Sequence, residues 1–416
     1  RRQRQMCIRD RYVTTADFAF HLYAEQIDID SVQSAINPSV GKQLSVGLNT
    51  EMGEMLVAVH HLVIDALSWP VLIQDLLGSY QQEMGVDSYV FASKTHNQAD
   101  WYEALENLHI SHKQSEFWNA QRAEPAFAEG SAKEGESKGI HKHSYHLTKE
   151  LAEPMFASTQ AYARMSKEQT LMALSALSVK QITSANEIVI HRESHGRFSE
   201  PFGLDLSRSV NWHTALFPQK VVLSDGVSEL LACVKDGSHA ISDGGLSYSA
   251  GVVQQQWQYQ GNVDVLFNFL GRATQADVKG AELGEFGLWR PENAKADAAI
   301  ALNISETDEG FDVELEFSLS ALSKSECDAY VHHLEAAIKA VTEHCTSNQA
   351  VLTQADAPNT NLSLATLSHV SGNAHQLPNQ ILPLSTLQQG LYFHAQLSQE
   401  TSTYVNQITL PISGAD

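Results

Sequence analysis

The segment LVAVHHLVIDALSW, residues 56–69, decides how the rest of the chain is interpreted. Its first part is short and apolar, which predicts a buried strand that runs into a loop. His60 and His61 end that strand, and because side chains alternate along a strand, one imidazole can enter the core while the other faces a cleft. Asp65 follows, where its carboxylate can bond the loop backbone or pair with an arginine. A neutral imidazole is the natural proton-transfer group at physiological pH, so the segment is a candidate catalytic element.

An adjacent histidine pair is weak evidence by itself, because such pairs are most often packing or surface residues. His332 and His333 form such a pair: they lie within a helical pattern, and Ala337 stands where an aspartate would be needed. The pair at residues 60 and 61 is followed by an aspartate, a serine and a tryptophan. The full pattern HHxxxDxxSW is far more specific than the dipeptide.

Strands and amphipathic helices interleave along the chain, which predicts an α/β protein of two lobes. We expect a helix after the histidine segment, with Ser68 as its N-cap and Pro70 in its first turn. The apolar stripe of that helix comprises Trp69, Leu72, Ile73, Leu76, Leu77 and Tyr80. Residues 170–181 have a helical pattern, and the sequence EIVIH at residues 187–191 predicts a strand.

The sequence FDVELEFS, residues 311–318, alternates perfectly and predicts a half-buried strand. A helix follows it, because Ser323 and Glu326 form a capping-box pattern. The core face of that helix comprises Tyr330, Val331, Leu334, Ile338 and Val341. The polar, glycine-rich residues 128–143 predict a loop or a boundary between lobes. Residues 346–380 lose all periodicity and predict a linker.

A second group of reactive side chains lies in HRESHGR, residues 191–197, directly after the strand expected at 187–191. It contains Glu193, His195 and Arg197. A carboxylate at a strand end, facing a cleft beside apolar walls, can have a raised pKa and can both accept and donate a proton. Taken alone, such a segment is more often an ordinary surface loop with a Glu–Arg pair.

The composition limits the partners. The chain has 49 acidic and 27 basic residues, a formal net charge of −22. Such a surface repels phosphate backbones and anionic lipids, so we expect no nucleic-acid and no membrane partner. The four cysteines form no CxxC pair, and no stretch approaches about 18 apolar residues, so we expect a cytoplasmic protein with reduced thiols.

The sequence offers no strong metal or nucleotide motif. His141 and His143 in HKHSYH would share one face of any strand, but no cysteine or acidic residue stands at ligand spacing. GxGxxG, Walker and GxSxG motifs are all missing. We therefore expect neither a metal site nor a bound nucleotide.

Taken together, the motifs resemble the condensation-domain superfamily of non-ribosomal peptide synthetases. HHxxxDxxSW is similar to that superfamily's signature, and its SW ending resembles the epimerisation branch. HRESHGR is similar to the EGHGR motif of that branch, with Ser194 in place of the first glycine, and Ala66 replaces the usual glycine after the aspartate. Residues 205–218, DLSRSVNWHTALFP, resemble SRTVGWFTxxFP, and residues 265–272, VLFNFLGR, resemble the FNYLG element.

This resemblance implies roles for individual residues. It makes His61 the active imidazole and Glu193 the catalytic carboxylate. The remaining matched positions are supporting residues: His60, Asp65, Ser68, Trp69, His195, Arg197, Trp212, Tyr248 and Asn268. Tyr248 lies in SDGGLSYSAG, residues 242–251, where serines replace glycines that the family favours.

The implied fold is a pair of chloramphenicol-acetyltransferase-like α/β lobes that form a V around a tunnel. Residues 12–127 would form the N-terminal lobe, with its first part missing, and residues 144–345 the C-terminal lobe. Residues 381–416, which begin ILPLSTLQQGLYFHAQL, resemble the opening PLSxLQxGxLFH segment of a following condensation domain.

The implied reaction inverts the Cα of an aminoacyl or peptidyl thioester on the phosphopantetheine arm of a carrier protein. The domain itself would bind no cofactor. Its partners would be an upstream peptidyl carrier domain and a downstream condensation domain. Two alternatives remain open: a condensation domain that joins two carrier-bound substrates, and an inactive fragment that serves as an interaction module.

Overall fold

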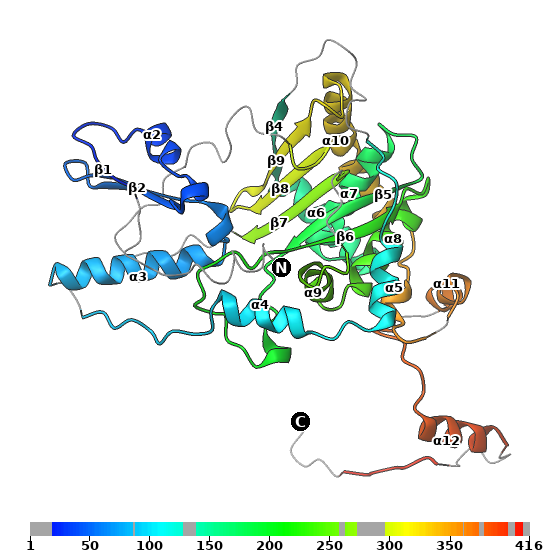
Figure 1. Cartoon of the computed structure of the whole chain (residues 1–416). Coiled ribbons are helices and arrows are strands. Elements are labelled where there is room, and N and C mark those ends of the chain that lie inside the picture. The colour runs from blue at the N-terminus through cyan, green and yellow to red at the C-terminus, as the bar shows by residue number, and fades with distance from the viewer. Residues whose placement is uncertain are drawn as a thin grey trace, which may run out of the picture.

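The computed structural model describes residues 19–85, 88–127, 139–257, 263–272, 296–360, 362–373, 378–397 and 404–410. They form two sheets, each with helices, and a C-terminal arm (Figure 1). The α/β class and the two-lobe arrangement expected from the sequence are confirmed. None of the described helices is long and apolar enough to cross a membrane.

The N-terminal lobe contains a three-stranded sheet in the order β1-β2-β3, with bounds β1 (Ala19–Leu22), β2 (Leu44–Asn49) and β3 (Glu54–Val59). Strand β1 is parallel to β2, and β2 is antiparallel to β3. The lobe also contains α2 (Ile29–Ser34), η1 (Pro38–Val40), η2 (His61–Val63) and α3 (Ser68–Glu83). The histidine pair therefore lies at the junction of β3 and η2: His60 is the N-cap of η2, and His61 is its first residue.

The C-terminal lobe contains a six-stranded mixed sheet in the order β4-β9-β8-β7-β5-β6. Its strands are β4 (Ile140–Thr148), β5 (Glu187–Ser194), β6 (Ala215–Val222), β7 (Val265–Arg272), β8 (Ile300–Glu306) and β9 (Gly310–Ser318). The central strands β5, β7 and β8 are mutually parallel, and β4, β6 and β9 join antiparallel to their neighbours. The parallel strands end at one edge of the sheet, a common position for ligand sites.

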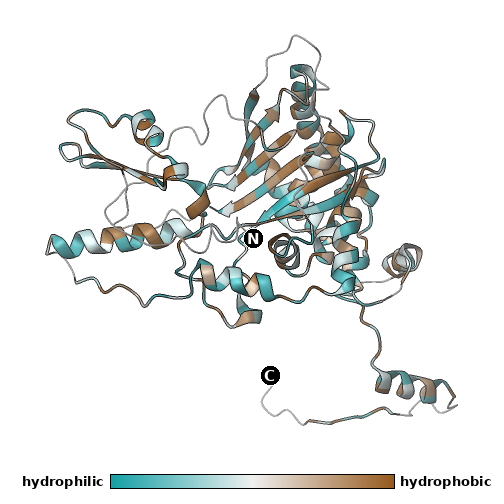
Figure 2. Cartoon of the chain, in the orientation of Figure 1, coloured by the Kyte–Doolittle hydropathy of each residue, from teal (hydrophilic) through white to brown (hydrophobic). Residues whose placement is uncertain are grey.

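Four helices pack on one face of this sheet and enclose the main core: α6 (Lys149–Ala163), α7 (Lys167–Lys180), α8 (Val227–Ala240) and α10 (Lys324–Ser347). The predicted strand at 311–318 lies within β9, and its alternate residues are buried as expected. The predicted capping box of Ser323 and Glu326 begins α10. Figure 2 shows the brown, apolar residues concentrated on the strands of the large sheet.

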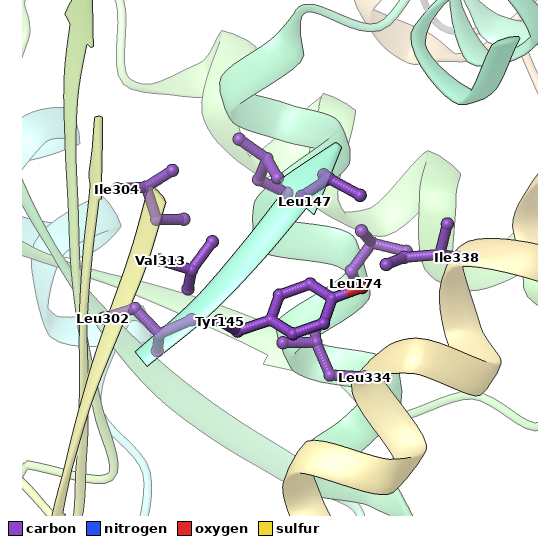
Figure 3. A pocket seen from close by; sticks show the side chains of 9 residues that line it. Tyr145, Leu147, Leu174, Leu302, Ile304, Val313, Leu334 and Ile338 are labelled. Atoms are coloured by element: carbon purple, nitrogen blue, oxygen red, sulfur yellow. The ribbon is translucent and has the colours of Figure 1, made fainter. Parts of the chain in front are cut away.

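A small apolar cavity lies inside this core, between the sheet and helices α7 and α10 (Figure 3). It is lined by Tyr145, Leu147, Leu171, Leu174, Leu302, Ile304, Val313, Leu334 and Ile338. No charged side chain lines it, and burial raises the pKa of the Tyr145 hydroxyl. The cavity is a packing feature of the core, because apart from Tyr145 its lining consists of aliphatic side chains.

Residues 96–127 were assigned to the N-terminal lobe from the sequence, but they pack on the C-terminal lobe. This segment contains α4 (Gln98–Asn107) and α5 (His112–Ala120). Trp101 of α4 packs with α9 (Leu246–Val253), and Trp118 of α5 donates a hydrogen bond to Ser247 at 2.9 Å. Residues 96–127 therefore belong to the C-terminal lobe, because the buried side chains of Trp101 and Trp118 pack there.

The helix after the histidine segment differs from its prediction in two ways. Leu67, not Ser68, is the N-cap of α3, because the Ser68 hydroxyl bonds Asp65 and a distant backbone instead. The predicted apolar stripe is only partly covered: Leu76 is 39% exposed and Tyr80 61% exposed. Periodicity showed where a partner should pack, but the described residues do not bury that stripe.

Residues 346–380, expected to be an irregular linker, contain regular structure: the end of α10, η4 (Gln354–Asp356) and α11 (Leu364–Asn373). Asp356 is buried and pairs with Lys235 of α8 at 2.6 Å. The Val351 amide donates to the Tyr162 carbonyl of α6 at 2.8 Å. The segment from Val351 to Asp356 is therefore a strap bound to the C-terminal lobe, and the expectation of a loose tether is corrected there. The lobe-boundary loop is also shorter than expected, since residues 140–143 belong to β4.

Helix α12 (Thr386–Leu397), which follows α11, is the ordered element expected beyond residue 380. This helix extends away from both lobes in Figure 1 and has no buried residue. Its apolar side chains, among them Leu387 and Phe393, are exposed. Helix α12 therefore makes no contribution to the core of the two lobes.

Candidate functional site

The histidine pair lies where β3 ends and η2 begins. The Nδ1 atom of His60 accepts a hydrogen bond from the Leu62 amide at 3.2 Å, which fixes the turn. The Nδ1 atom of His61 lies 2.6 Å from the Ile64 carbonyl oxygen. Because a carbonyl oxygen can only accept, Nδ1 of His61 carries a proton, and the neutral ring therefore has its lone pair on Nε2. The exposed imidazole of His61 is thus held as the tautomer that can take up a proton at Nε2.

Asp65 is the centre of the hydrogen-bond network behind these histidines. Its Oδ1 accepts from the Ser68 amide at 2.9 Å and from the Ser68 hydroxyl at 2.6 Å. The same oxygen lies 2.7 Å from a guanidinium nitrogen of Arg197, while Oδ2 accepts from the His213 amide at 3.1 Å. The Asp65 carboxylate thus bonds its own loop and pairs with an arginine of the second motif. Both members of the ion pair are buried.

Arg197 reaches Asp65 because of an unusual backbone at Gly196. Gly196 has φ +63°, and a Cβ atom there would collide with the His213 carbonyl oxygen. A side chain is therefore excluded both by conformation and by close approach. The Arg197 guanidinium also donates to the backbone carbonyls of Leu206 and Ser209 at 2.7 and 2.8 Å. These bonds compensate the charge of the guanidinium, as a buried arginine requires.

Residues 209–215 connect the two motifs. The Asn211 amide donates to the Ser68 hydroxyl at 3.1 Å, and that hydroxyl lies 2.9 Å from the Asn211 carbonyl. The next residue, Trp212, is 41% exposed, and its ring meets His61 edge-on at 6.4 Å between centroids. The segment therefore holds an indole beside the candidate imidazole.

His213 is buried within the same segment, and its Nε2 lies 2.9 Å from the Ser209 hydroxyl. Burial, followed by the positive charge of Arg197, lowers its pKa to about 4. The His213 imidazole is therefore neutral at physiological pH, and its backbone amide serves Asp65. The SRTVGWFTxxFP pattern, which residues 205–218 resemble, has phenylalanine at this position. An uncharged ring there is consistent with a neutral His213.

Glu193 lies in β5 rather than in a loop, because the strand continues beyond residue 191 to Ser194. It pairs with Leu216 of β6, and Ser194 pairs with Ala215. The bonded segment 209–215 leads directly into this pairing, so the same stretch contacts both His61 and the strand of Glu193. The Ser194 hydroxyl donates to the Gly244 carbonyl at 2.7 Å, which accommodates the serine that replaces a glycine.

Two more side chains share the face of the sheet that Glu193 occupies. Arg192 pairs with Phe267 of the parallel strand β7, so the next residues, Glu193 and Asn268, lie at neighbouring positions. His191 lies two residues before Glu193 on the same face and is only 1% exposed. Burial lowers its pKa to about 4, and neither ring nitrogen has a hydrogen-bond partner among the described residues. The sequence interpretation did not single out His191.

The remaining predicted residues are supporting or distant. The His195 ring packs on Phe198 at 4.4 Å between centroids, and its Nδ1 accepts from the Arg197 amide at 3.0 Å. Burial lowers the pKa of His195. Trp69 is half-buried in the first turn of α3. Tyr248 belongs to a buried aromatic cluster with Trp118 and Trp257 on α9 and its neighbours, and this cluster lies against β6.

The structure thus joins Asp65, Ser68 and Arg197 directly, sets His61 beside Trp212, and puts Glu193 and Asn268 in one row. The backbone bonds of Asn211 and His213 were missed, because a sequence pattern carries no signal for main-chain partners. Among the described residues, no three histidine, cysteine, aspartate or glutamate side chains are grouped as metal ligands.

Comparison with known proteins gives one family match: a model described as condensation domain matches residues 42–361. One component of the linear gramicidin synthase of Brevibacillus parabrevis is 25% identical over 412 residues, covering 94% of this chain and 5% of that protein. Bacitracin synthase 3 of Bacillus licheniformis is 24% identical over 404 residues, covering 92% of this chain and 6% of that protein. The chain therefore spans a small fraction of these relatives.

Solved structures with the same fold include the epimerization domain from the third module of tyrocidine synthetase B. It matches with a TM-score of 0.66 and 20% identity, covering 80% of this chain and 81% of that one. SgcC5 protein from Streptomyces globisporus matches with a TM-score of 0.56 and 16% identity, covering 78% and 81%. At these identities the likeness shows a common fold.

Proposed function

The chain belongs to the condensation-domain family, and we propose that within it the chain is an epimerisation domain of a non-ribosomal peptide synthetase. Its substrate is an aminoacyl or peptidyl thioester on the phosphopantetheine arm of a carrier protein, and its reaction inverts the Cα. The observation that carries this proposal is Glu193: a carboxylate near the end of β5, tied through residues 209–215 to the loop of His61.

The proposed chemistry uses two groups that come from different lobes. A thioester acidifies the α-proton, so a base can remove it while the C–H electron pair moves onto the thioester oxygen as an enolate. Return of the electron pair with a proton delivered to the opposite face inverts the centre, without any net oxidation. Inversion needs groups on two faces, and His61 with its Nε2 lone pair and the carboxylate of Glu193 can supply them. His61 could equally stabilise the enolate charge.

Condensation is the second candidate, and it belongs to the same family. Formation of a peptide bond between two carrier-bound substrates needs one base, and His61 has the tautomer for that role. The condensation reaction assigns no catalytic role to a carboxylate at residue 193. A non-catalytic interaction module is the third candidate.

The partners follow from the proposed reaction. An upstream peptidyl carrier domain presents the substrate, and a downstream condensation domain accepts the product. The phosphopantetheine belongs to the carrier, so the domain holds no cofactor of its own. Such an assembly line works in the cytoplasm.

One assay separates the three functions. The chain is incubated in D2O with a carrier loaded with an L-aminoacyl thioester, and the released amino acid is analysed for chirality and deuterium. A D/L mixture with deuterium at Cα supports epimerisation. A dipeptide formed with a second loaded carrier supports condensation. The absence of both products supports a non-catalytic module.

A further inference from the structure

The three parallel strands at the centre of the large sheet carry polar residues at matching positions: near the end of β5 and in the middle of β7 and β8. Glu193 directly follows Arg192, which pairs with Phe267 of β7, and Asn268 of β7 pairs with Asn303 of β8. Paired residues of neighbouring strands point to the same face. Glu193, Asn268 and Asn303 therefore form one row across β5, β7 and β8.

This row lies on the face opposite the main core. Phe267 and Leu302, one residue earlier on their strands, are buried among the helices. Arg192, one residue before Glu193, reaches Glu168 of α7 on that same helical side at 2.5 Å. Because side chains alternate, the next residue on each strand faces away from the helices. Central parallel strands usually carry apolar residues on both faces, so a polar row across them needs an explanation.

The two asparagines are joined by a hydrogen bond. Nδ2 of Asn268 donates to Oδ1 of Asn303 at 3.2 Å. That contact draws the nitrogen end of the Asn268 amide toward β8. With its nitrogen end engaged on β8, the same planar group has its carbonyl end left for the side of β5, the strand that carries Glu193. A single acceptor on β8 thus decides which end of the Asn268 amide faces the candidate carboxyl group.

We propose that Asn303 is a positioning residue, which orients the Asn268 amide beside Glu193 for the proton transfer. The inference rests on the proposed function. An amide carbonyl accepts a hydrogen bond from a protonated carboxyl group, so the oriented Asn268 holds Glu193 in place while it carries the proton to be delivered. If the amide turned over, its N–H end would favour the carboxylate over the protonated carboxyl group that delivers the proton.

The test is a double-mutant cycle on α-proton exchange. Asn303→Ala removes the acceptor and should lower kcat about tenfold, the loss expected from one hydrogen bond, with KM and melting temperature unchanged. Asn303→Asp keeps an Oδ acceptor and should restore most of kcat. In an Asn268→Ala background, Asn303→Ala should have no further effect, because its role passes through Asn268.

Glu314→Gln is the matched control, since Glu314 pairs with Asn303 in the same row but bonds Ser144 instead. It should leave kcat unchanged. If the wild-type chain exchanges the α-proton and Asn303→Ala does so equally fast, or if the two asparagine variants add independently, the positioning role is overturned while the proposed function stands. Absence of exchange in the wild-type chain overturns both.

Discussion

Asp65 shows how one buried carboxylate can organise a site. It accepts bonds from its own loop, from the Arg197 guanidinium and from the His213 amide. The sequence pattern located Asp65, Ser68 and Arg197, because motif spacing reports residue types at fixed places. It could not show that Asn211 and His213 take part through backbone atoms, since any residue other than proline has both an amide and a carbonyl.

Asp65→Ala should destabilise the chain by about 3–5 kcal/mol, because it leaves the Arg197 charge buried without a counter-charge. Urea unfolding measures this loss. Asp75→Ala is the control: it breaks the more exposed pair with Arg208 and should cost about 1 kcal/mol or less. His61→Ala should cost little stability, because its ring is exposed, while activity falls strongly. Equal losses for the two aspartates would contradict the assigned role of Asp65.

Glu193→Gln should leave the fold intact and lower the α-proton exchange rate by roughly 10²–10⁴, the usual contribution of a positioned acid or base. Deuterium incorporation into the thioester measures it. Glu187→Gln, at the start of the same strand, is the matched control and should exchange at the wild-type rate. Exchange by Glu193→Gln at a rate near that of the wild type would remove Glu193 from the mechanism.

At the scale of elements, the sequence patterns predicted the strands and helix ends that depend on neighbouring residues in the chain. The alternation of residues 311–318 gave β9, and Ser323 with Glu326 gave the start of α10. The strap was missed because its order depends on a tertiary contact: Asp356 pairs with Lys235, 121 residues away. The apolar stripe of α3 was expected to be buried but is partly exposed for the same reason. Periodicity indicates an apolar face, but it does not show whether another element covers that face.

The strap, Val351 to Asp356, should contribute to the stability of the C-terminal lobe. The C-terminal arm, residues 382–416, should not. Asp356→Ala leaves Lys235 buried and unpaired, so we expect a loss of about 3–5 kcal/mol in urea unfolding. Removal of residues 382–416 takes away only exposed described side chains and should leave the melting temperature unchanged. A large drop in melting temperature for the shortened chain would show that the arm packs on the lobes.

At the scale of the whole molecule, two buried histidines make stability depend on pH. His191 and His213 have pKa values of about 4 in the folded chain and 6.5 when solvated. Between those values the unfolded chain binds more protons, so stability is fully present above about pH 6.5 and falls as the pH drops toward about 4. Each histidine contributes a loss of at most about 3 kcal/mol.

The check is urea unfolding of the wild-type chain and of His213→Phe across this pH range. Phenylalanine cannot be protonated, so the variant should lose less stability between about pH 6.5 and 4. Parallel curves for the two proteins would show that His213 is already solvated in the folded chain.

The link between Arg197 and Asp65 also has a consequence for the order of assembly during synthesis. The two residues are 132 positions apart, so the carboxylate leaves the ribosome long before its partner exists. Until residues 197–213 have emerged, the Asp65 carboxylate lacks its arginine and the His213 amide, and it bonds only Ser68 of its own loop. Closing a loop of this length has an entropic cost, and proteins dominated by such non-local contacts fold slowly. The hydrogen-bond network of Asp65 is therefore completed only after residues 197–213 have been synthesised.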